Sequence, residues 1–258
     1  MSILSVEKLT KQFGGLTAVS DINLSIQKNE LVGLIGPNGA GKTTFFNLLT
    51  GVYKPTEGKI SLNVGKEPIS LIDKRTDQIA SLGIARTFQN IRLFKQLTVM
   101  DNVLIGMHQK NNVGTIRSIL RVPSFFKMED KLKKEALELL AIFNLEDSSD
   151  VLAENLSYGQ QRRLEIVRAL ATEPSLLFLD EPAAGMNPQE SVELTKLIRK
   201  IQQEFDLTVI LIEHDMSVVM NVCERIYVLE YGRLLAEGTP EAIRSNPDVL
   251  RAYLGEEE

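Results

Sequence analysis

Near the amino terminus, hydrophobic and polar residues alternate in short stretches, a pattern that predicts strands exposed on one face. The alternation runs through residues 3–6 and 22–26 and returns at residues 59–62, after a turn that contains Pro55 and Gly58. Successive side chains of a strand point to opposite faces of its sheet, so an alternating stretch buries one face only. These stretches, with the turns between them, predict a small antiparallel sheet.

The middle of the chain, from about residue 90 to residue 155, has the pattern of helices. Its apolar residues recur at helical spacing, as in the series Leu132, Ala136, Leu139, Leu140 and Phe143. Side chains three and four positions apart share one face of a helix, so this series predicts an amphipathic helix. We expect a helical subdomain in this region.

Uniformly apolar runs predict strands of a different kind at residues 31–35, 176–179 and 208–212. A strand without alternation is buried on both faces. An amphipathic helix is predicted between the last two runs, at residues 192–205. Strands that alternate with helices are typical of a mostly parallel sheet covered by helices on both faces.

Taken together, these regions predict one α/β domain that occupies residues 1–258. About residues 1–89 and 156–258 supply the two sheets, and the helical subdomain is inserted at about residues 90–155. A chain of 258 residues, 43% of them hydrophobic, can bury a core of this size.

Composition narrows the class of protein. The net charge of −5 argues against a general nucleic-acid-binding protein, so we expect no nucleic-acid partner. The single cysteine, Cys223, excludes an intrachain disulfide and is expected to be a small buried apolar residue. No signal peptide is evident, and no apolar run approaches the roughly 18 residues of a membrane span. We therefore expect a cytoplasmic protein that only another chain could hold at a membrane.

Residues 36–44 carry the most specific chemistry. They fit the phosphate-binding loop pattern G-x-x-x-x-G-K-[ST], between a predicted strand and a predicted helix. Such a turn directs backbone N–H groups and the positive end of the helix dipole at one point, which favours a phosphate. Lys42 would contact the β- and γ-phosphates, and the Thr43 hydroxyl would bind Mg²⁺. The nucleotide-binding residues expected in this loop are Asn38, Gly39, Ala40, Gly41, Lys42, Thr43 and Thr44.

Two carboxylates, Asp180 and Glu181, follow directly after the apolar run at residues 176–179. Open α/β sheets bind ligands at the carboxyl ends of their strands. We expect Asp180 to hold the water shell of Mg²⁺ and Glu181 to polarise the water that attacks the γ-phosphate. A solvated strand end is the simpler alternative. His214 closes the next buried strand, and its place favours a role at the same site over a structural hydrogen bond.

The segment from Leu156 to Arg163 is, by itself, a helix start capped by Ser157. Its letters L-S-x-G-Q resemble the signature motif of ATP-binding-cassette (ABC) ATPases, and the other motifs match that family in order along the chain. The resemblance covers nearly the whole chain. It implies a P-loop NTPase core with an antiparallel β-subdomain and an inserted α-helical subdomain.

The resemblance also implies roles for single residues. Phe13 falls where the family places the aromatic ring that stacks on adenine, and Val19 is expected to pack beside the base. Gln89 resembles the Q-loop glutamine and His214 the switch histidine. The implied catalytic residues are Glu181, His214, Gln89 and Lys42, the implied metal ligands are Thr43, Gln89 and Asp180, and the implied contacts to nucleotide in a second subunit are Ser157, Gly159 and Gln160.

Several segments resemble the ATPases of branched-chain amino-acid importers in particular. They include residues 86–89, 157–166, 183–188 and 246–254 and an extra segment at 108–130. The ATPase of lipopolysaccharide export is a close relative and remains an alternative. Asn187 stands where most of the superfamily has aspartate, so we expect a dimer contact there that carries no charge.

One phosphate loop and one signature motif in a single chain resemble half of a head-to-tail dimer with a second ABC ATPase subunit, of the same or a related chain. The resemblance further implies integral membrane permease subunits, an external substrate-binding protein, and a place on the inner face of the plasma membrane. The membrane partner would meet the region that contains Phe94, Leu97, Val99 and Val103. We expect at least half of these four residues to be core and the exposed ones to form the socket.

Two other functions remain open. Soluble ABC ATPases that act on ribosomes or DNA usually fuse two cassettes or insert long coiled coils, and this sequence has neither. A regulatory module that binds nucleotide without turnover would not need both Glu181 and His214. The sequence therefore favours a transport ATPase that uses ATP and Mg²⁺.

Overall fold

The computed structural model describes residues 1–65, 67–108 and 123–254, so much of the extra segment at 108–130 lies outside the described residues. Two sheets organise the chain. The smaller has the strand order β2-β1-β4-β5 and is antiparallel. Its strands are β1 (Ser2–Phe13), β2 (Leu16–Gln27), β4 (Glu57–Leu62) and β5 (Ile69–Ser70). The predicted antiparallel sheet is thus confirmed.

The larger sheet has the order β10-β9-β3-β8-β7-β6, and only β10 runs antiparallel to its neighbour. Its strands are β3 (Leu31–Ile35), β6 (Ile84–Arg86), β7 (Leu176–Asp180), β8 (Thr208–Ile212), β9 (Arg225–Glu230) and β10 (Arg233–Gly238). Every residue of β3, β7 and β8 is buried, as the uniformly apolar runs predict.

Alternate side chains of these central strands pack into two separate hydrophobic cores on opposite faces of the sheet. In β3, Leu31 and Ile35 belong to one core, while Val32 and Leu34 belong to the other. The first core is shared with helices, and the second with the small sheet and α1 (Lys42–Leu49). Helix α1 therefore lies between the two sheets, directly after the phosphate loop.

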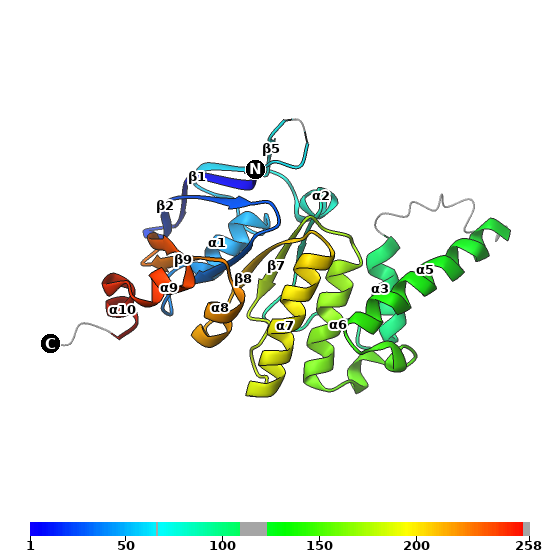
Figure 1. Ribbon diagram of the computed structural model, residues 1–258. Coiled ribbons are helices and arrows are strands. Elements are labelled where there is room, and N and C mark those ends of the chain that lie inside the picture. The colour runs from blue at the N-terminus through cyan, green and yellow to red at the C-terminus, as the bar shows by residue number, and fades with distance from the viewer. Residues whose placement is uncertain (66, 109–122, 255–258) are drawn as a thin grey trace.

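Most of the other described helices cover the opposite face of the large sheet and extend to one side (Figure 1), whereas α2 packs through Ile79 into the core that contains α1 and the small sheet. They are α2 (Thr76–Ser81), α3 (Val99–His108), α5 (Pro123–Ile142), α6 (Tyr158–Leu170), α7 (Pro188–Glu204), α8 (Met216–Val222), α9 (Pro240–Arg244) and α10 (Pro247–Leu254), with the short 3₁₀ helices η1 (Glu146–Ser148) and η2 (Ala153–Asn155). Figure 1 places α3 and α5 at the end of the molecule opposite α9 and α10.

The predicted apolar series is buried, and Ala136, Leu139, Leu140 and Phe143 belong to the first core, which also contains residues of α3 and α6. The α/β class and the two-sheet architecture are confirmed, whereas the proposed domain limits near residues 90 and 155 stay an interpretation of the sequence. Among the described residues, no helix has the length and apolar character needed to cross a membrane.

Candidate nucleotide site

The phosphate loop joins β3 to α1 through glycines that no other residue could replace. Gly36 has φ 152° and Gly41 has φ 95°. A β-carbon would lie 2.1 Å from the Leu229 carbonyl oxygen at Gly36 and 2.5 Å from the Ala18 carbonyl oxygen at Gly41. Gly41 is the N-cap of α1 and offers no side chain, so the first N–H groups of the helix remain available for an anion.

Lys42 is buried at this helix start. Its amine donates to the carbonyl oxygens of Gly36, at 2.6 Å, and Pro37, at 3.0 Å. Burial lowers the pKa of Lys42, because the charged form loses solvation, and the nearby Glu181 carboxylate partly opposes this shift. The loop thus keeps a cation where the phosphates of a nucleotide would lie.

A cavity of about 560 Å³ brings together motifs that are far apart in the sequence. The phosphate loop lines it from Asn38 to Thr44, and Gln89, Glu181 and His214 line it as well. The predicted catalytic residues, including Lys42, therefore surround one space large enough for a triphosphate.

Glu181 is the centre of the polar contacts in this cavity. Gln89 Nε2 donates to Glu181 Oε2 at 3.0 Å, and His214 Nε2 lies 2.8 Å from Glu181 Oε1. The backbone of Glu181 has φ 47°, a left-handed conformation that non-glycine residues adopt only where their surroundings hold it. Its N–H donates to the carbonyl of Ile212 on the adjacent strand. The carboxylate is thereby aimed into the cavity, as a general base requires.

The three expected metal ligands are not all in the cavity. Thr43 and Gln89 line it, but Asp180 does not. Asp180 ends β7 as predicted and is buried, and its Oδ2 accepts from Arg86 Nη2 at 2.7 Å. A hydroxyl, an amide oxygen and a carboxylate are hard oxygen donors that suit Mg²⁺, which commonly keeps several waters. The residues present fit a hydrated Mg²⁺. Asp180 lies behind the residues that line the cavity, so it would contact the ion through water.

The signature residues lie on another surface of the chain. Ser157 Oγ accepts from the Gln160 N–H at 3.3 Å, and Gln160 Oε1 accepts from the Ser157 N–H at 3.0 Å, which forms a capping box at the start of α6. Ser157, Gly159 and Gln160 are absent from the cavity wall. Within one chain the structure does not bring the signature motif to the phosphate loop.

The two residues expected to contact adenine, Phe13 and Val19, do not line the cavity. The Phe13 ring is 43% exposed and packs edge-on against Tyr53, with ring centres 5.3 Å apart, and it does not line the cavity. Val19 has no exposed surface and belongs to the core between the sheets, so its side chain is not available to a base. Residues 16–18 line the cavity in its place.

Besides residues 16–18, two residues at or next to the cavity, Tyr231 and Glu213, are not among those predicted from the sequence. Tyr231, in the turn between β9 and β10, is 85% exposed and lines the cavity. Glu213 is buried beside His214 and accepts the N–H groups of Ala183, at 2.8 Å, and His214, at 3.3 Å. Burial raises the pKa of Glu213. An acidic residue between a buried strand and a predicted catalytic histidine was the signal that could have identified it.

Comparisons with known proteins identify the family of the chain. Residues 19–184 match the family model of the ABC transporter, and residues 233–258 match that of the branched-chain amino acid ATP-binding cassette transporter. The chain is 49% identical over 254 residues to the high-affinity branched-chain amino acid transport ATP-binding protein LivG of Escherichia coli K12, with 98% of each chain covered. It is 48% identical to BraF of Pseudomonas aeruginosa, a protein of the same description, again with 98% of each covered.

More distant relatives share the fold. The lipopolysaccharide export system ATP-binding protein LptB of Haemophilus influenzae is 36% identical over 257 residues, covering 100% of this chain and 99% of LptB. The crystal structure of an ABC transporter ATP-binding cassette in its ADP conformation superposes with a TM-score of 0.84 and 31% identity, covering 99% of this chain and 100% of that one. The resemblance inferred from the motifs is confirmed: the chain belongs to the ABC transporter family, as one of its ATP-hydrolysing cassettes.

Proposed function

We propose that this chain hydrolyses MgATP to power the import of branched-chain amino acids through membrane subunits. The observation that carries the cargo assignment is the 49% identity to LivG over 98% of both chains. The separate match of residues 233–258 to the branched-chain family supports it. Identity to the lipopolysaccharide export ATPase is 36%, so that alternative has weaker support.

The geometry of the cavity supports a separate role in ATP hydrolysis for each group of residues. Lys42 and the N–H groups of the phosphate loop would bind the phosphates. Thr43 and Gln89, with Asp180 through water, would hold Mg²⁺, which neutralises charge on the phosphate oxygens. Glu181 would orient and deprotonate the attacking water once its contacts with Gln89 and His214 rearrange.

A second ATPase subunit would complete each site. The signature residues and the phosphate loop lie on different surfaces, so neither can close on the other within one chain. One bacterial ABC transporter cassette, solved as a dimer, matches this chain with a TM-score of 0.76 and 27% identity, covering 92% of this chain and 98% of that one. We infer a head-to-tail dimer in which the exposed Ser157 and the half-buried Gly159 contact the partner's nucleotide.

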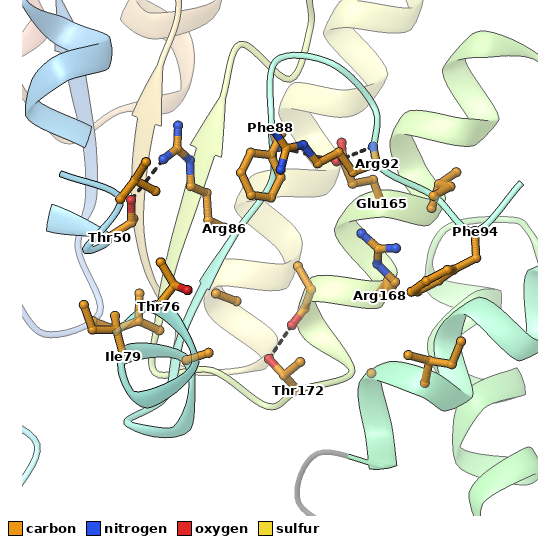
Figure 2. A pocket seen from close by; sticks show the side chains of 18 residues that line it. Thr50, Thr76, Ile79, Arg86, Phe88, Arg92, Phe94, Glu165, Arg168 and Thr172 are labelled. Carbon is orange, nitrogen blue, oxygen red and sulfur yellow. Dashed lines mark hydrogen bonds between the residues drawn. The ribbon is translucent and has the colours of Figure 1, made fainter. Parts of the chain in front are cut away.

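A groove beside the site suits a membrane partner. It has a volume of about 740 Å³ and is lined by residues of α2, β6, α3 and α6, several of which are labelled in Figure 2. Phe94 is exposed at its wall, and the Arg168 guanidinium lies 5.4 Å from the Phe94 ring centre. Of the four residues in the expected contact region, Val99 and Val103 are buried while Phe94 and Leu97 are exposed, which supports Phe94 and Leu97 as the socket.

This groove could receive a short helix of a permease subunit at the inner face of the plasma membrane. A largely apolar wall that also carries Arg86, Arg92 and Arg168 would suit the carbonyl end of such a helix. An external binding protein would deliver the amino acid from the other side of the membrane.

Uptake of radiolabelled leucine tests the proposed function in cells that lack the gene. Uptake should fall in these cells, return with the wild-type chain, and stay low with the Glu181→Gln variant. Unchanged uptake, together with lipopolysaccharide that no longer reaches the cell surface, would reassign the chain to the export system.

A further inference from the structure

Two buried charges on α6 have no place in the roles described so far. Arg162 and Glu165 are 1% and 2% exposed, and Arg162 Nη1 lies 3.0 Å from Glu165 Oε2. Neither residue lines the ATP cavity. A buried ion pair adds little net stability, because the loss of hydration offsets most of the attraction. The pair is therefore better explained by the other groups that it holds.

Both side chains hold the loop that carries Gln89, and they hold it by its backbone. Arg162 Nη1 donates to the carbonyl of Phe88 at 2.6 Å, and Arg162 Nη2 donates to the carbonyl of Gln89. Glu165 Oε1 accepts a hydrogen bond from the N–H of Arg92 at 3.1 Å and a longer one from the N–H of Phe88 at 3.4 Å. Figure 2 shows Glu165 beside Phe88 and Arg92, at the wall of the groove. One ion pair thus binds the N–H and carbonyl of Phe88, the carbonyl of Gln89 and the N–H of Arg92, in a loop outside any helix or strand.

The same guanidinium reaches the backbone of the catalytic carboxylate. Arg162 Nη2 lies 3.4 Å from the carbonyl oxygen of Glu181. The side chains of Gln89 and Glu181 contact each other at 3.0 Å inside the cavity. Arg162 therefore touches the backbone at both ends of that contact. The left-handed backbone of Glu181 needs such external support.

We propose that the Arg162–Glu165 pair is a positioning unit, which sets the separation of Gln89 and Glu181 for attack by water. The pair acts through backbone carbonyls and N–H groups and contacts neither nucleotide nor water. Helix α6 begins directly after Ser157, so the helix that carries the signature motif also carries this pair. A displacement of α6 moves Gln89 and Glu181 with it.

Glu165→Gln tests the proposal, because it keeps the side-chain volume and removes the charge that orients Arg162. In the chain, or in its assembled complex if only that complex turns over ATP, kcat should fall by about tenfold or more. The KM for MgATP should stay within about twofold, since the phosphate loop is untouched. Amide hydrogen exchange at residues 88–92 should accelerate while the phosphate loop keeps its protection.

Glu193→Gln is the matched control. It removes an ion pair between α6 and α7, in which Arg163 Nη2 lies 2.8 Å from Glu193 Oε2. Neither kcat nor exchange at residues 88–92 should change in this variant.

A wild-type kcat in folded Glu165→Gln overturns the proposal. A KM that rises as kcat falls, or faster exchange throughout the chain, overturns it as well, because either result marks general damage. Arg162→Lys, assayed well below its own Tm, is the second test. It keeps the positive charge but cannot reach three carbonyls at once, and it should show the same fall of kcat at constant KM.

Discussion

The position of Lys42 suits phosphate binding but lowers the stability of the folded, nucleotide-free chain. Burial lowers the pKa of its amine from the usual 10.5, so the unfolded chain binds the proton more tightly than the folded chain does. The charged amine therefore destabilises the nucleotide-free protein at neutral pH. This penalty diminishes as the pH rises through the folded-state pKa toward 10.5.

Lys42→Ala should abolish most MgATP affinity and leave the fold intact, because the amine faces loop carbonyls and not the apolar core. Thermal unfolding with and without MgATP is the measurement. The wild-type Tm should rise with nucleotide, since a ligand that binds only the folded state stabilises it. The variant Tm should not respond. An equal rise in both proteins would remove Lys42 from the binding site.

Phe13 remains the proposed platform for adenine, since its ring is exposed near the cavity residues 16–18. Base–aromatic stacking contributes about 1–3 kcal/mol, so Phe13→Ala should weaken ATP binding roughly tenfold, and Phe13→Tyr should be nearly neutral. Inorganic tripolyphosphate has no base, and its affinity for Phe13→Ala should equal that for the wild type.

Calorimetric titration of both ligands separates the outcomes. Equal losses for ATP and tripolyphosphate would mean that Phe13→Ala disturbs the phosphate loop. Normal ATP binding by Phe13→Ala, with weak binding by Tyr231→Ala, would place the base at the turn between β9 and β10 instead.

The sequence predicts those parts of the site whose determinants are local. The conformation of residues 36–44 is determined within the loop itself, by glycines with positive φ and by the bond from Lys42 to the Gly36 carbonyl. The structure contains this loop as expected. Val19 is different, because the face of the sheet to which its side chain points depends on how β2 pairs with β1. That pairing is irregular between Leu9 and Lys11 and again between Lys11 and Gln12. A bulge changes which face a side chain takes, so alternation alone could not place Val19.

Asp180 shows a second limit of prediction from the sequence: its ion-pair partner lies far away along the chain. Its partner Arg86 comes from β6, and that arginine also donates to Asn47 at 2.7 Å and to Thr50 at 3.0 Å. Nothing in the segment around Asp180 indicates this partner. The position of the carboxylate behind the cavity wall follows from the packing of β6 beside β7.

Helix α7 begins at Pro188, before the residue 192 predicted from apolar spacing. Asn187 accounts for the difference. Its Oδ1 accepts the Glu190 N–H at 3.0 Å, and Glu190 Oε2 accepts the Asn187 N–H at 3.0 Å. This capping box comes before the first apolar residue of the helix, where hydrophobic periodicity gives no signal.

The cap gives Asn187 a structural role beside the proposed dimer contact. Asn187→Ala should lower the free energy of unfolding by about 1 kcal/mol, while Asn187→Asp should retain most of it, because aspartate caps equally well. Urea denaturation of the three proteins is the measurement. Equal stability of the alanine variant and the wild type would show that the cap contributes nothing measurable.

The proposed docking groove can be probed by cross-linking, because the chain has one cysteine and that residue is buried. Burial also raises the pKa of the Cys223 thiol, so little reactive thiolate forms. Phe94→Cys should cross-link to a permease subunit in the membrane-bound complex. Val64→Cys, exposed on the connection between β4 and β5, is the control and should not. Cross-linking at Val64 but not at Phe94 would place the membrane partner elsewhere.

Glu181→Gln tests the assembly as a whole, because it removes the base and keeps the binding residues. A glutamine side chain preserves the size of Glu181 but cannot take the proton of the attacking water, so hydrolysis should fall by about 10²-fold or more. The unhydrolysed γ-phosphate would then keep Ser157 and Gly159 of the second subunit engaged. Contacts made only in the closed state shift the equilibrium toward that state. The variant should therefore accumulate as an ATP-bound dimer.

Phosphate release and size-exclusion chromatography in MgATP measure the two effects on one sample. If the natural dimer contains a related ATPase, that chain is included in both assays. Because binding depends on Lys42 and Thr43, ATP affinity should be unchanged in the variant. Slow hydrolysis without a dimer would leave Glu181 as the base and contradict the head-to-tail assembly. Hydrolysis at the wild-type rate would contradict the role of Glu181 itself, and the contacts of Gln89 and His214 with that carboxylate would then need another explanation.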